Sequence, residues 1–197
     1  MPEGPEVKIA STYFNNFFKE SKEIKFEILT NYYRKKYNDV FTQINNHIRS
    51  FQPTYTVGKN IFINLSRELI FNFHLGMTGG WSSQLKKHCH FRVYSESKEL
   101  FFRDVRKFGK MRIISKEMFN TKHTSYYDML HEEYNYNMHI KFLEEKVGKK
   151  RSICSVLLDQ RYFPGVGNYI KSEALYLSMV HPEEKWSNIL GEKRKKL

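Results

Sequence analysis

The sequence predicts an α+β protein in which an N-terminal helix precedes an antiparallel β-sandwich and a helical region follows. Three observations support this fold class. Apolar residues recur at helical spacing near the start, short β-rich runs fill the middle of the chain, and helical patterns resume beyond about residue 120. The chain has 197 residues, of which 40% are hydrophobic and 16% aromatic, so it can bury a substantial core.

The first predicted element is an amphipathic helix over residues 4–20, because Val7, Ala10, Phe14 and Phe17 recur at helical spacing. Short runs with the composition of strands then follow at residues 24–28, 61–65, 69–73, 90–94, 100–102 and 111–114. Strands this short and this frequent are typical of an antiparallel sandwich.

The helical region is predicted to contain helices over residues 138–147, 153–159 and 169–179. The change of pattern falls in a polar connector near residues 116–126. We therefore predict two domains, residues 1–120 and residues 121–197. No internal repeat or low-complexity tract is present, although residues 193–196 form a basic run.

The chain is strongly basic, since 33 Lys and Arg residues against 21 Asp and Glu residues give a formal charge of +12 and a pI near 9.5. This charge predicts attraction to a polyanion, with nucleic acid as the default partner. An acidic membrane surface is the rival partner, but no apolar segment approaches the ~18 residues of a membrane span. No signal peptide is recognisable, so an intracellular protein is expected. Cys89 and Cys154 are expected to be reduced thiols.

The N-terminus combines a nucleophile with an acid. Methionine before a small residue such as proline is normally trimmed, which exposes the secondary amine of Pro2 beside Glu3. An α-amino group titrates at roughly pH 7.7–8.0, so a fraction of it is neutral and nucleophilic at physiological pH. Such an amine can attack a sugar C1′ to form an iminium while Glu3 handles the proton. The simpler interpretation is that Glu3 only opens a helix, where acidic residues suit the dipole.

A glycine-containing turn at residues 161–168 separates the last two predicted helices. Gly165 and Gly167 permit positive φ and close backbone approach, and Asn168 is placed to cap the helix that follows. The backbone N–H groups at such a helix start can bind an anion. Taken alone, a turn of this kind is more often only a helix start.

Five sequence blocks occur along the chain: Met-Pro-Glu-Gly-Pro-Glu at residues 1–6, Val-Gly-Lys-Asn-Ile at 57–61, His-Leu-Gly-Met-Thr-Gly at 74–79, Asp-Val-Arg-Lys-Phe-Gly at 104–109 and Gly-Val-Gly-Asn-Tyr at 165–169. In this order they resemble the formamidopyrimidine-DNA glycosylase and endonuclease VIII family of base-excision repair enzymes. Matching positions run from Pro2 to about His181. Gly4 and the pair Asn168 and Tyr169 are more similar to the endonuclease VIII side.

The resemblance implies a bifunctional DNA glycosylase and abasic-site lyase that removes oxidised bases. In that scheme Pro2 is the nucleophile that forms the Schiff base, and Glu3 transfers protons. Lys59 contacts phosphate and assists the chemistry at the sugar, and Glu6 is a supporting carboxylate. Glu6 follows Glu3 by about one helical turn, so both can face one cavity, although Glu6 could serve only to stabilise the helix start. β-Elimination is implied, and a further δ-elimination is left open.

An enzyme that attacks C1′ within a duplex must first extrude the nucleotide, which leaves a gap in the base stack. Met77, Arg106 and Phe108 match the family residues that fill this gap. Arg106 and Phe108 are predicted to alternate on an extended segment and so to project in one direction. The alternative is that Met77 and Phe108 pack in the core while Arg106 is a solvated surface residue.

The resemblance also implies that His90 and Lys150 contact the DNA backbone and that Asn168 binds phosphate in a helix-two-turn-helix element. His88 is chemically an equal neighbour of His90. A metal site formed by both histidines and Cys89 is not supported, because no carboxylate or second cysteine pair lies at ligand spacing. Neither a metal nor a cofactor is expected.

Most members of this family continue into a C-terminal finger, which is either zinc-bound or metal-free. This sequence stops at Leu197 and contains no such finger, so we expect either a truncated chain or a protein that works without the finger. The missing finger puts catalytic efficiency and the second elimination in doubt. The alternative function is a finger-less DNA-binding protein that recognises damaged or abasic DNA with little or no turnover. An RNA-binding protein is a weaker alternative, because it leaves Pro2, Glu3 and Lys59 without a role.

The expected partner is double-stranded DNA containing oxidised bases or abasic sites, bound by a monomer in the nucleus, the nucleoid or another DNA-containing compartment. The preferred lesion is left open. Gly4 and the pair Asn168 and Tyr169 favour oxidised pyrimidines and formamidopyrimidines, whereas the gap-filling set also occurs in 8-oxoguanine enzymes.

Overall fold

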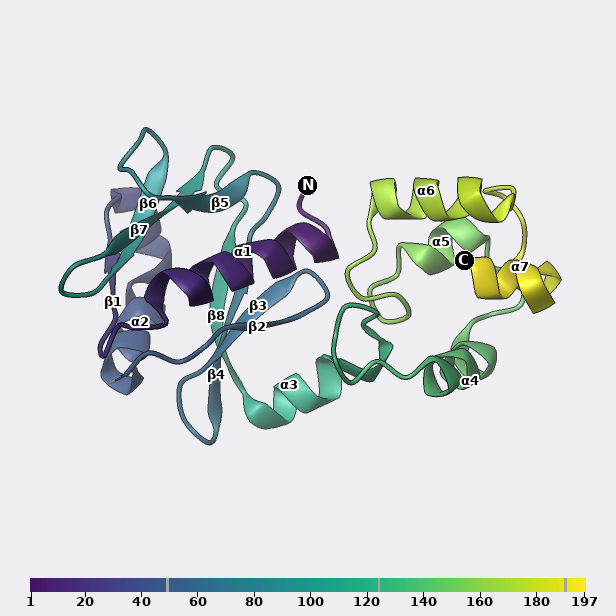
Figure 1. Ribbon diagram of the computed structural model, residues 1–197, viewed down its shortest axis with the longest axis horizontal. Coiled ribbons are helices and arrows are strands. Elements are labelled where there is room, and N and C mark those ends of the chain that lie inside the picture. The colour runs from purple at the N-terminus through teal and green to yellow at the C-terminus, as the bar shows by residue number, and fades with distance from the viewer. Residues whose placement is uncertain (49, 124, 190) are drawn as a thin grey trace.

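The computed structural model describes residues 1–48, 50–123, 125–189 and 191–197. Two antiparallel sheets with flanking helices form its first part, and a helical part follows (Figure 1). The strands are β1 (Lys25–Ile28), β2 (Tyr55–Val57), β3 (Asn60–Asn64), β4 (Leu69–His74), β5 (Gly79–Ser82), β6 (Cys89–Tyr94), β7 (Glu99–Asp104) and β8 (Lys110–Ser115). The helices beside them are α1 (Gly4–Phe18), α2 (Asn31–His47) and α3 (Lys116–Lys122). The predicted α+β fold class is confirmed.

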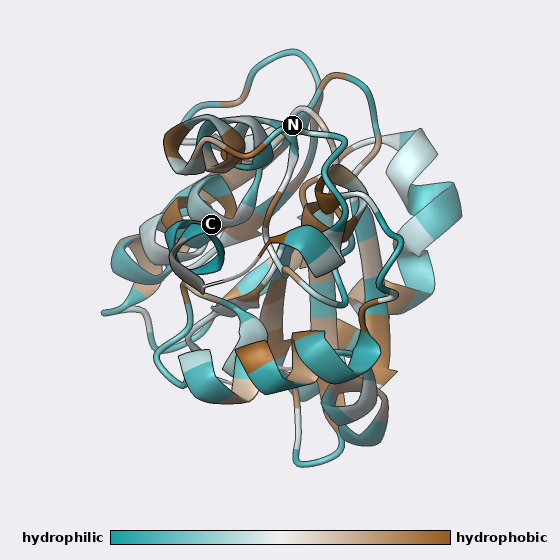
Figure 2. Ribbon diagram, turned by 90° about the vertical axis from the view of Figure 1, so that its right-hand side faces the viewer, coloured by the Kyte–Doolittle hydropathy of each residue, from teal (hydrophilic) through white to brown (hydrophobic). Residues whose placement is uncertain are grey.

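Each sheet has four strands, in the orders β1-β6-β7-β5 and β2-β3-β4-β8, and every pairing is antiparallel. Apolar side chains from both sheets and from α1 and α2 form one core, in which Phe71, Phe73, Phe91 and Phe102 are almost fully buried. Figure 2 shows that the strands are largely hydrophobic and most connecting loops hydrophilic. Burial of this aromatic core is therefore the main stabilising term of the first part.

Helix α1 packs on β2, β3 and β5 and carries the N-terminus to the junction with the helical part (Figure 1). Its buried face contains Val7, Phe14 and Phe18, and the carbonyl of Ala10 accepts a hydrogen bond of 3.2 Å from Trp81 Nε1. The helix ends at Phe18 rather than at residue 20 as predicted. This packing holds the N-terminal residues in a defined place.

Helix α2 was missed by the sequence prediction. Its buried residues Tyr33, Tyr37, Phe41 and Ile44 do recur at helical spacing, but lysines and asparagines between them obscure the pattern. Strands β2 and β5 were also missed, because β2 has only three residues and β5 begins with two glycines, which are poor strand formers.

The helical part contains α4 (Tyr136–Lys146), α5 (Ile153–Leu157), α6 (Asn168–Ser178) and α7 (Gly191–Lys196), with 3₁₀ turns at Ser125–Tyr127 and Trp186–Asn188. The first three correspond to the predicted helices, with ends shifted by at most two residues. The side chains of Asn135 and Ser152 cap α4 and α5. A separate apolar cluster holds these helices together, with Leu143, Ile153 and Val156 at its centre. The domain boundary near residue 120 stays a prediction. No described helix is long and apolar enough to cross a membrane.

The two parts meet through closely packed backbone. The N–H of Gly4 donates a hydrogen bond of 2.8 Å to the carbonyl of Gly165, and a Cβ on Gly58 would lie 3.1 Å from the backbone nitrogen of Gly165. Gly58 and Gly165 have φ values of +60° and +91°, which favour glycine. The buried carboxylate of Asp128 accepts hydrogen bonds from the N–H groups of Gly58, at 2.7 Å, and Leu130, at 3.0 Å. Sequence reasoning gave Asp128 no role.

Candidate active site and DNA interface

The centre of the site is the carboxylate of Glu3, which is only 3% exposed. It accepts hydrogen bonds from the backbone N–H groups of Gly167, Tyr169 and Ile170, at 2.7, 3.0 and 3.2 Å. These donors belong to the start of α6, where unpaired N–H groups and the helix dipole favour a negative charge. Pro2, the residue after Met1, thus directly precedes a carboxylate that the helical part holds in place.

This contact corrects the predicted cap of α6. Asn168 is the first helical residue and Gly167 is the N-cap, so Asn168 does not cap the helix by its side chain. The carboxylate of Glu3 takes that role, and a Cβ on Gly167 would lie 2.2 Å from its Cδ. Three of the N–H groups predicted to face an external anion are therefore occupied by Glu3. Asn168 itself is exposed, and its role in phosphate binding stays a prediction.

Glu6 lies one turn further along α1 and is anchored from both sides. Its Oε2 accepts a hydrogen bond of 2.9 Å from the N–H of Glu3, and its Oε1 accepts one of 2.9 Å from the hydroxyl of Tyr169. Desolvation raises the pKa of Glu6, but these hydrogen bonds outweigh it and lower the pKa below its usual value. Tyr169 therefore links α6 to α1 through both its backbone and its side chain, a role that the sequence did not reveal.

Lys59 lies at the turn before β3 and is 9% exposed. The left-handed Gly58 makes this turn possible, and Lys59 borders the cavity between the two parts. Desolvation lowers the pKa of Lys59, while the negative charge of Glu3 opposes that shift. The structure thus brings the predicted catalytic residues Glu3 and Lys59 within electrostatic range of each other, next to the partly exposed Pro2.

The predicted gap-filling residues project from two adjacent loops. Met77 and Phe108 are 40% and 52% exposed, so neither packs in the core. Arg106 donates a hydrogen bond from Nη1 to the sulfur of Met77 at 3.4 Å, and its backbone N–H donates to the hydroxyl of Thr78 at 3.0 Å. These contacts bring the two loops together at one edge of the sandwich, although insertion of their side chains into DNA stays a proposal.

The buried carboxylate of Asp104 fixes both loops. It accepts hydrogen bonds from the hydroxyl of Thr78 at 2.5 Å and from the N–H of Gly109 at 2.8 Å. On the other side of the loop, the carbonyl of Gly109 accepts a hydrogen bond of 2.9 Å from the hydroxyl of Tyr37. Asp104 stands in the block that carries Arg106, and the structure shows that it braces this loop from inside the protein.

The segment that carries Arg106 and Phe108 is not a regular extended strand, contrary to prediction. Lys107 between them has a φ of +58°, in the left-handed region, so the loop turns sharply there. Gly76 in the adjacent loop packs directly on this turn, because a Cβ there would lie 2.5 Å from the carbonyl carbon of Phe108. Simple strand alternation therefore does not describe how the two side chains project.

His90 is buried and stacks on Tyr33, with the ring centroids 4.5 Å apart. Its Nε2 lies 2.8 Å from the carbonyl of Asp104, and its Nδ1 lies 3.1 Å from the hydroxyl of Thr30. Both ring nitrogens are thus engaged inside the protein. The predicted phosphate contact of His90 stays a prediction, and in this structure it would require the ring to release one of these hydrogen bonds.

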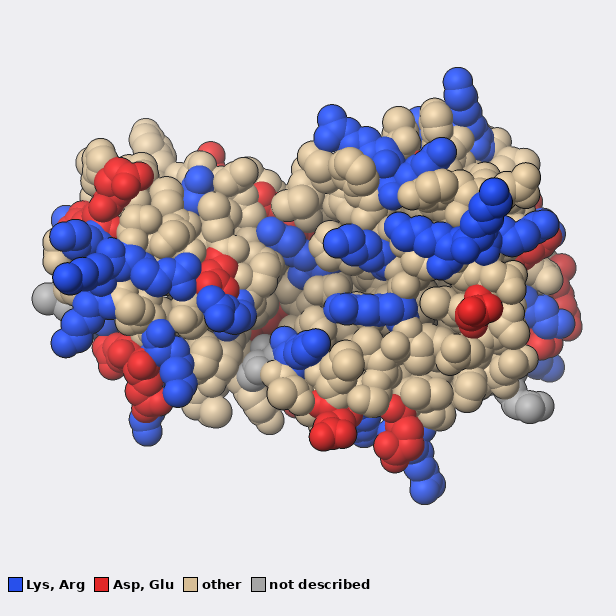
Figure 3. All heavy atoms as spheres, turned by 180° about the vertical axis from the view of Figure 1, so that it is seen from behind, with Lys and Arg blue, Asp and Glu red and all other residues tan. Residues whose placement is uncertain are grey.

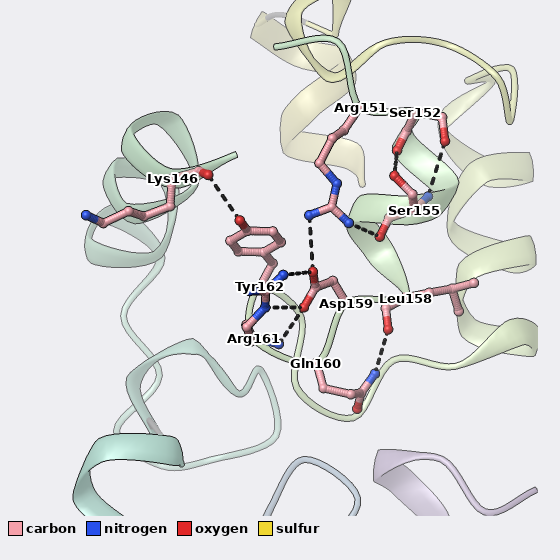
Figure 4. Close-up of polar contacts among 9 residues, drawn as sticks. All are labelled: Lys146, Arg151, Ser152, Ser155, Leu158, Asp159, Gln160, Arg161 and Tyr162. Carbon is pink, nitrogen blue, oxygen red and sulfur yellow. Dashed lines mark hydrogen bonds and ion pairs between the residues drawn. The ribbon is translucent and has the colours of Figure 1, made fainter. Parts of the chain in front are cut away.

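Lys150 is exposed on the loop between α4 and α5, where a phosphate could reach it. The next residue, Arg151, has a defined place, because its Nη1 donates to the carboxylate of Asp159 at 3.1 Å (Figure 4). Asp159 also binds Arg161 through two hydrogen bonds of 2.9 and 2.7 Å. On the face shown in Figure 3, Lys and Arg side chains spread over both parts and beside the boundary between them. This distribution suits a polyanionic partner.

Comparison with known proteins agrees with this arrangement. Residues 1–111 match the family model described as formamidopyrimidine-DNA glycosylase N-terminal domain, and residues 127–197 match the one described as formamidopyrimidine-DNA glycosylase H2TH domain. A formamidopyrimidine-DNA glycosylase of Bacillus cereus is 34% identical over 143 residues, which are 68% of this chain and 51% of the relative. One from Rickettsia felis is 31% identical, over 66% of this chain and 49% of the relative.

The fold also resembles solved structures. A complex of Lactococcus lactis Fpg with abasic-site DNA has a TM-score of 0.78 and 22% identity, and covers 98% of this chain and 73% of that one. A MutM complex with DNA containing carbocyclic 8-oxo-G has a TM-score of 0.79 and 22% identity, over 99% of this chain and 74% of that one.

The two matched models are the N-terminal and H2TH domains of formamidopyrimidine-DNA glycosylases, and they follow each other along this chain as its sandwich and helical parts do. The chain belongs to the formamidopyrimidine-DNA glycosylase family, as its sequence blocks predicted. It spans about half the length of the curated relatives that it matches.

Proposed function

We propose that the chain acts as a DNA glycosylase and abasic-site lyase in base-excision repair, with Pro2 as its nucleophile once Met1 is removed. The observation that carries this proposal is the carboxylate of Glu3, buried directly after Pro2 and held by three backbone N–H groups of the helical part. Burial of a charged carboxylate costs free energy, which its hydrogen bonds must offset. A carboxylate held in one direction, with Lys59 in electrostatic range, is typical of a functional site.

In the first half of the proposed reaction, the secondary amine of Pro2 attacks C1′ of the damaged nucleotide. As the amine nitrogen bonds to C1′, the C1′–N bond to the base breaks, and the base departs with the proton that the amine loses. The C1′–O4′ bond then breaks as the nitrogen lone pair forms the iminium, and Glu3, next to Pro2 in the chain, delivers a proton from solvent to O4′. Lys59 supports this step by placing positive charge near the sugar and its phosphate.

In the second half, the iminium between Pro2 and C1′ makes the C2′ proton acidic. Removal of that proton expels the 3′ phosphate by β-elimination, and hydrolysis of the iminium then releases the amine. The mechanism needs neither metal nor cofactor. We leave open whether the 5′ phosphate is also eliminated.

Attack at C1′ within a duplex requires that the nucleotide leave the base stack. We propose that Met77, Arg106 and Phe108 fill the gap, since all three project from loops that Asp104 braces. Preorganised loops lower the entropic cost of inserting side chains into DNA. Lys150 and Asn168, both exposed, are the proposed phosphate contacts of the helical part.

The substrate class is a duplex with an oxidised base or an abasic site, which places the protein in a DNA-containing compartment. The titles of similar structures name abasic-site DNA for the Lactococcus lactis protein and 8-oxo-G DNA for MutM. Gly4 and the pair Asn168 and Tyr169 support a preference for oxidised pyrimidines and formamidopyrimidines, as on the endonuclease VIII side.

A panel of matched duplexes tests this function directly. The purified protein is incubated with DNA containing thymine glycol, dihydrouracil, 8-oxoguanine or an abasic site, and base release and strand cleavage are measured separately. We expect release of at least one oxidised base and cleavage at the abasic site. Binding without release or cleavage on every duplex would instead identify a damage-binding protein without turnover.

A further inference from the structure

A cavity of about 690 Å³ lies between the sandwich and the helical part. Five basic side chains line the cavity: Lys59, His74, Lys122, His123 and Arg161. None of its described lining residues is acidic. The lysine pair comes from the turn before β3 and from the end of α3, and Arg161 comes from the helical part. Apart from Lys59, no residue of this set belongs to the predicted site.

His123 is half-buried and lines the cavity directly after the end of α3. Its ring packs against those of Phe62 and Phe119, with centroids 4.9 and 5.6 Å away. Among the residues that the structure describes, none forms a hydrogen bond with either ring nitrogen. Desolvation, together with the charges of Arg112 on β8 and Lys122 on α3, lowers the pKa of His123 to about 4. The imidazole is therefore neutral at physiological pH, although it faces an electropositive cavity.

His74 lines another wall of the cavity and also lies near positively charged side chains. Desolvation lowers its pKa, and the charges of Lys110, Lys59 and Arg112 lower it further. Its Nδ1 accepts a hydrogen bond of 3.0 Å from the N–H of Gly76, so the ring proton of the neutral form is on Nε2. His74 can thus donate one hydrogen bond through Nε2 without becoming charged.

Arg161 is bound by a carboxylate but remains accessible to an external anion. Asp159 binds its Nε at 2.9 Å and its Nη2 at 2.7 Å, while the side chain stays 76% exposed (Figure 4). The same carboxylate binds Arg151, so two guanidinium groups share one negative charge. Both guanidinium groups also stack on the ring of Tyr162, at 5.3 and 5.5 Å. The group is therefore rigid and keeps a net positive charge, as suits phosphate recognition.

We propose that this cavity binds a phosphodiester group of a DNA strand, with Lys122, His123 and Arg161 as contacts beyond the interface predicted around Lys59. The proposal rests on the proposed function, since it assumes that DNA occupies the space between the two parts. Cations from both parts would then grip the same strand. Free inorganic phosphate offers the same oxyanion chemistry and is the other source that the test must separate.

Proton uptake follows from such binding. A phosphate next to His123 favours its charged form, so the pKa of His123 rises from about 4 when the cavity is filled. DNA affinity is then greatest below the pKa that His123 has in the free protein. It falls as the pH rises from there through the higher pKa of the complex, and becomes independent of the protonation of His123 above that value.

The first test uses the unaltered protein. The ring C–H signal of His123, assigned with a His123→Asn variant, is followed by NMR against pH in the free protein, with an undamaged duplex, and with inorganic phosphate at matched ionic strength. We expect the duplex to raise the pKa of His123. A rise with inorganic phosphate but not with the duplex would overturn the strand contact, and no rise with either would overturn the site altogether.

The second test measures duplex affinity across a salt series. Lys122→Ala and Arg161→Ala should each reduce the slope of log affinity against log salt by about one unit, and Lys122→Arg should restore the slope. Lys19→Ala is the matched control, because Lys19 is at the opposite end of α1, about 20 Å from the junction. Slopes equal to the control would overturn the proposal.

Borohydride trapping of the same variants on abasic DNA separates this result from the proposed function. Unchanged slopes in variants that still form the trapped adduct would refute the cavity site alone. Failure of the unaltered protein to form an adduct would refute the proposed function, and the NMR titration would then still report whether the cavity binds phosphate.

Discussion

The carboxylate of Glu3 accepts a hydrogen bond of 2.7 Å from the backbone N–H of Gly167, a residue 164 positions further along the chain. Two more N–H groups of the same helix start bind this carboxylate. The helical part therefore does more than extend the surface available to DNA. It fixes the side chain next to the proposed nucleophile, so the proposed DNA binding and the proposed chemistry involve the same structural element.

Gly167→Ala should disrupt this arrangement, because the added Cβ would lie 2.2 Å from Cδ and Oε1 of Glu3. We expect the carboxylate to move, base excision to fall at least tenfold, and the folded state to lose about 2 kcal/mol through weakened hydrogen bonds to a buried charge. Excision kinetics and thermal unfolding measure the two effects. Gly148→Ala is the matched control, since its Cβ would come no closer than 3.7 Å to Arg151. Equal behaviour of both variants would contradict the assigned contact.

Glu3→Gln should lose base excision far more than cleavage of a preformed abasic site. Removal of an intact base needs proton transfer during sugar opening, whereas an abasic site already offers an aldehyde to Pro2. The amide also turns an N–H donor towards the donors of α6, so the variant should be less stable by about 2 kcal/mol. Rates on both substrates, compared at a temperature where the variant is folded, decide the matter. Equal losses would show that Glu3 does not serve base release specifically.

Lys59→Met should abolish excision yet raise the stability of the fold. The charged form of Lys59 is desolvated in the protein, so its replacement by an apolar side chain of similar length should stabilise by on the order of 1 kcal/mol at neutral pH. The folded-state pKa of Lys59 is below its ordinary value of 10.5, so the unfolded chain holds this proton to higher pH. The stability difference between variant and wild type should therefore narrow as the pH rises through the folded-state pKa.

Thermal or denaturant unfolding across that pH range checks this prediction. A variant that is less stable than the wild type at neutral pH would show that Lys59 is a structural residue paired with Glu3, not one maintained for catalysis.

Phe108→Ala should slow excision from a paired duplex more than from a single strand, where no stack has to be refilled. The side chain is 52% exposed, so its loss should change unfolding by less than 1 kcal/mol. The salt dependence of binding should also stay the same, because no charge is removed. Tyr13→Ala, which removes another exposed aromatic ring, serves as the control. A similar slowing on both substrates would remove Phe108 from the gap-filling set.

The fold could be predicted where local patterns are strong. The helix that begins at Gly4 was identified from helical spacing, six of the strands from short runs with strand composition, and the three principal helices of the helical part from the change to helical patterns. Helix α2 was missed, although Tyr33, Tyr37 and Phe41 carry its apolar face, because the polar residues between them hid the period. Apolar periodicity therefore predicts a helix only when few polar or charged residues interrupt it.

The sequence predicted which residues form the candidate site but not the contacts that they make. Pro2, Glu3 and Lys59 stand in recognisable blocks, yet nothing in the sequence indicates that Glu3 caps a helix 164 residues away. Asp104 escaped notice for the same reason, since its partner Thr78 lies in another loop. Long-range hydrogen bonds of this kind depend on how the sheets and the helical part pack, which periodicity and composition do not encode.

The most direct test of the account is to identify the residue that bonds covalently to DNA. Protein shown by mass spectrometry to begin at Pro2 is incubated with an abasic-site duplex and sodium borohydride, and the adduct is digested and sequenced by mass spectrometry. The account predicts a reduced adduct on the nitrogen of Pro2, and none with a preparation that retains Met1. An adduct on Lys59 or another lysine, or full lyase activity in protein that retains Met1, would contradict it.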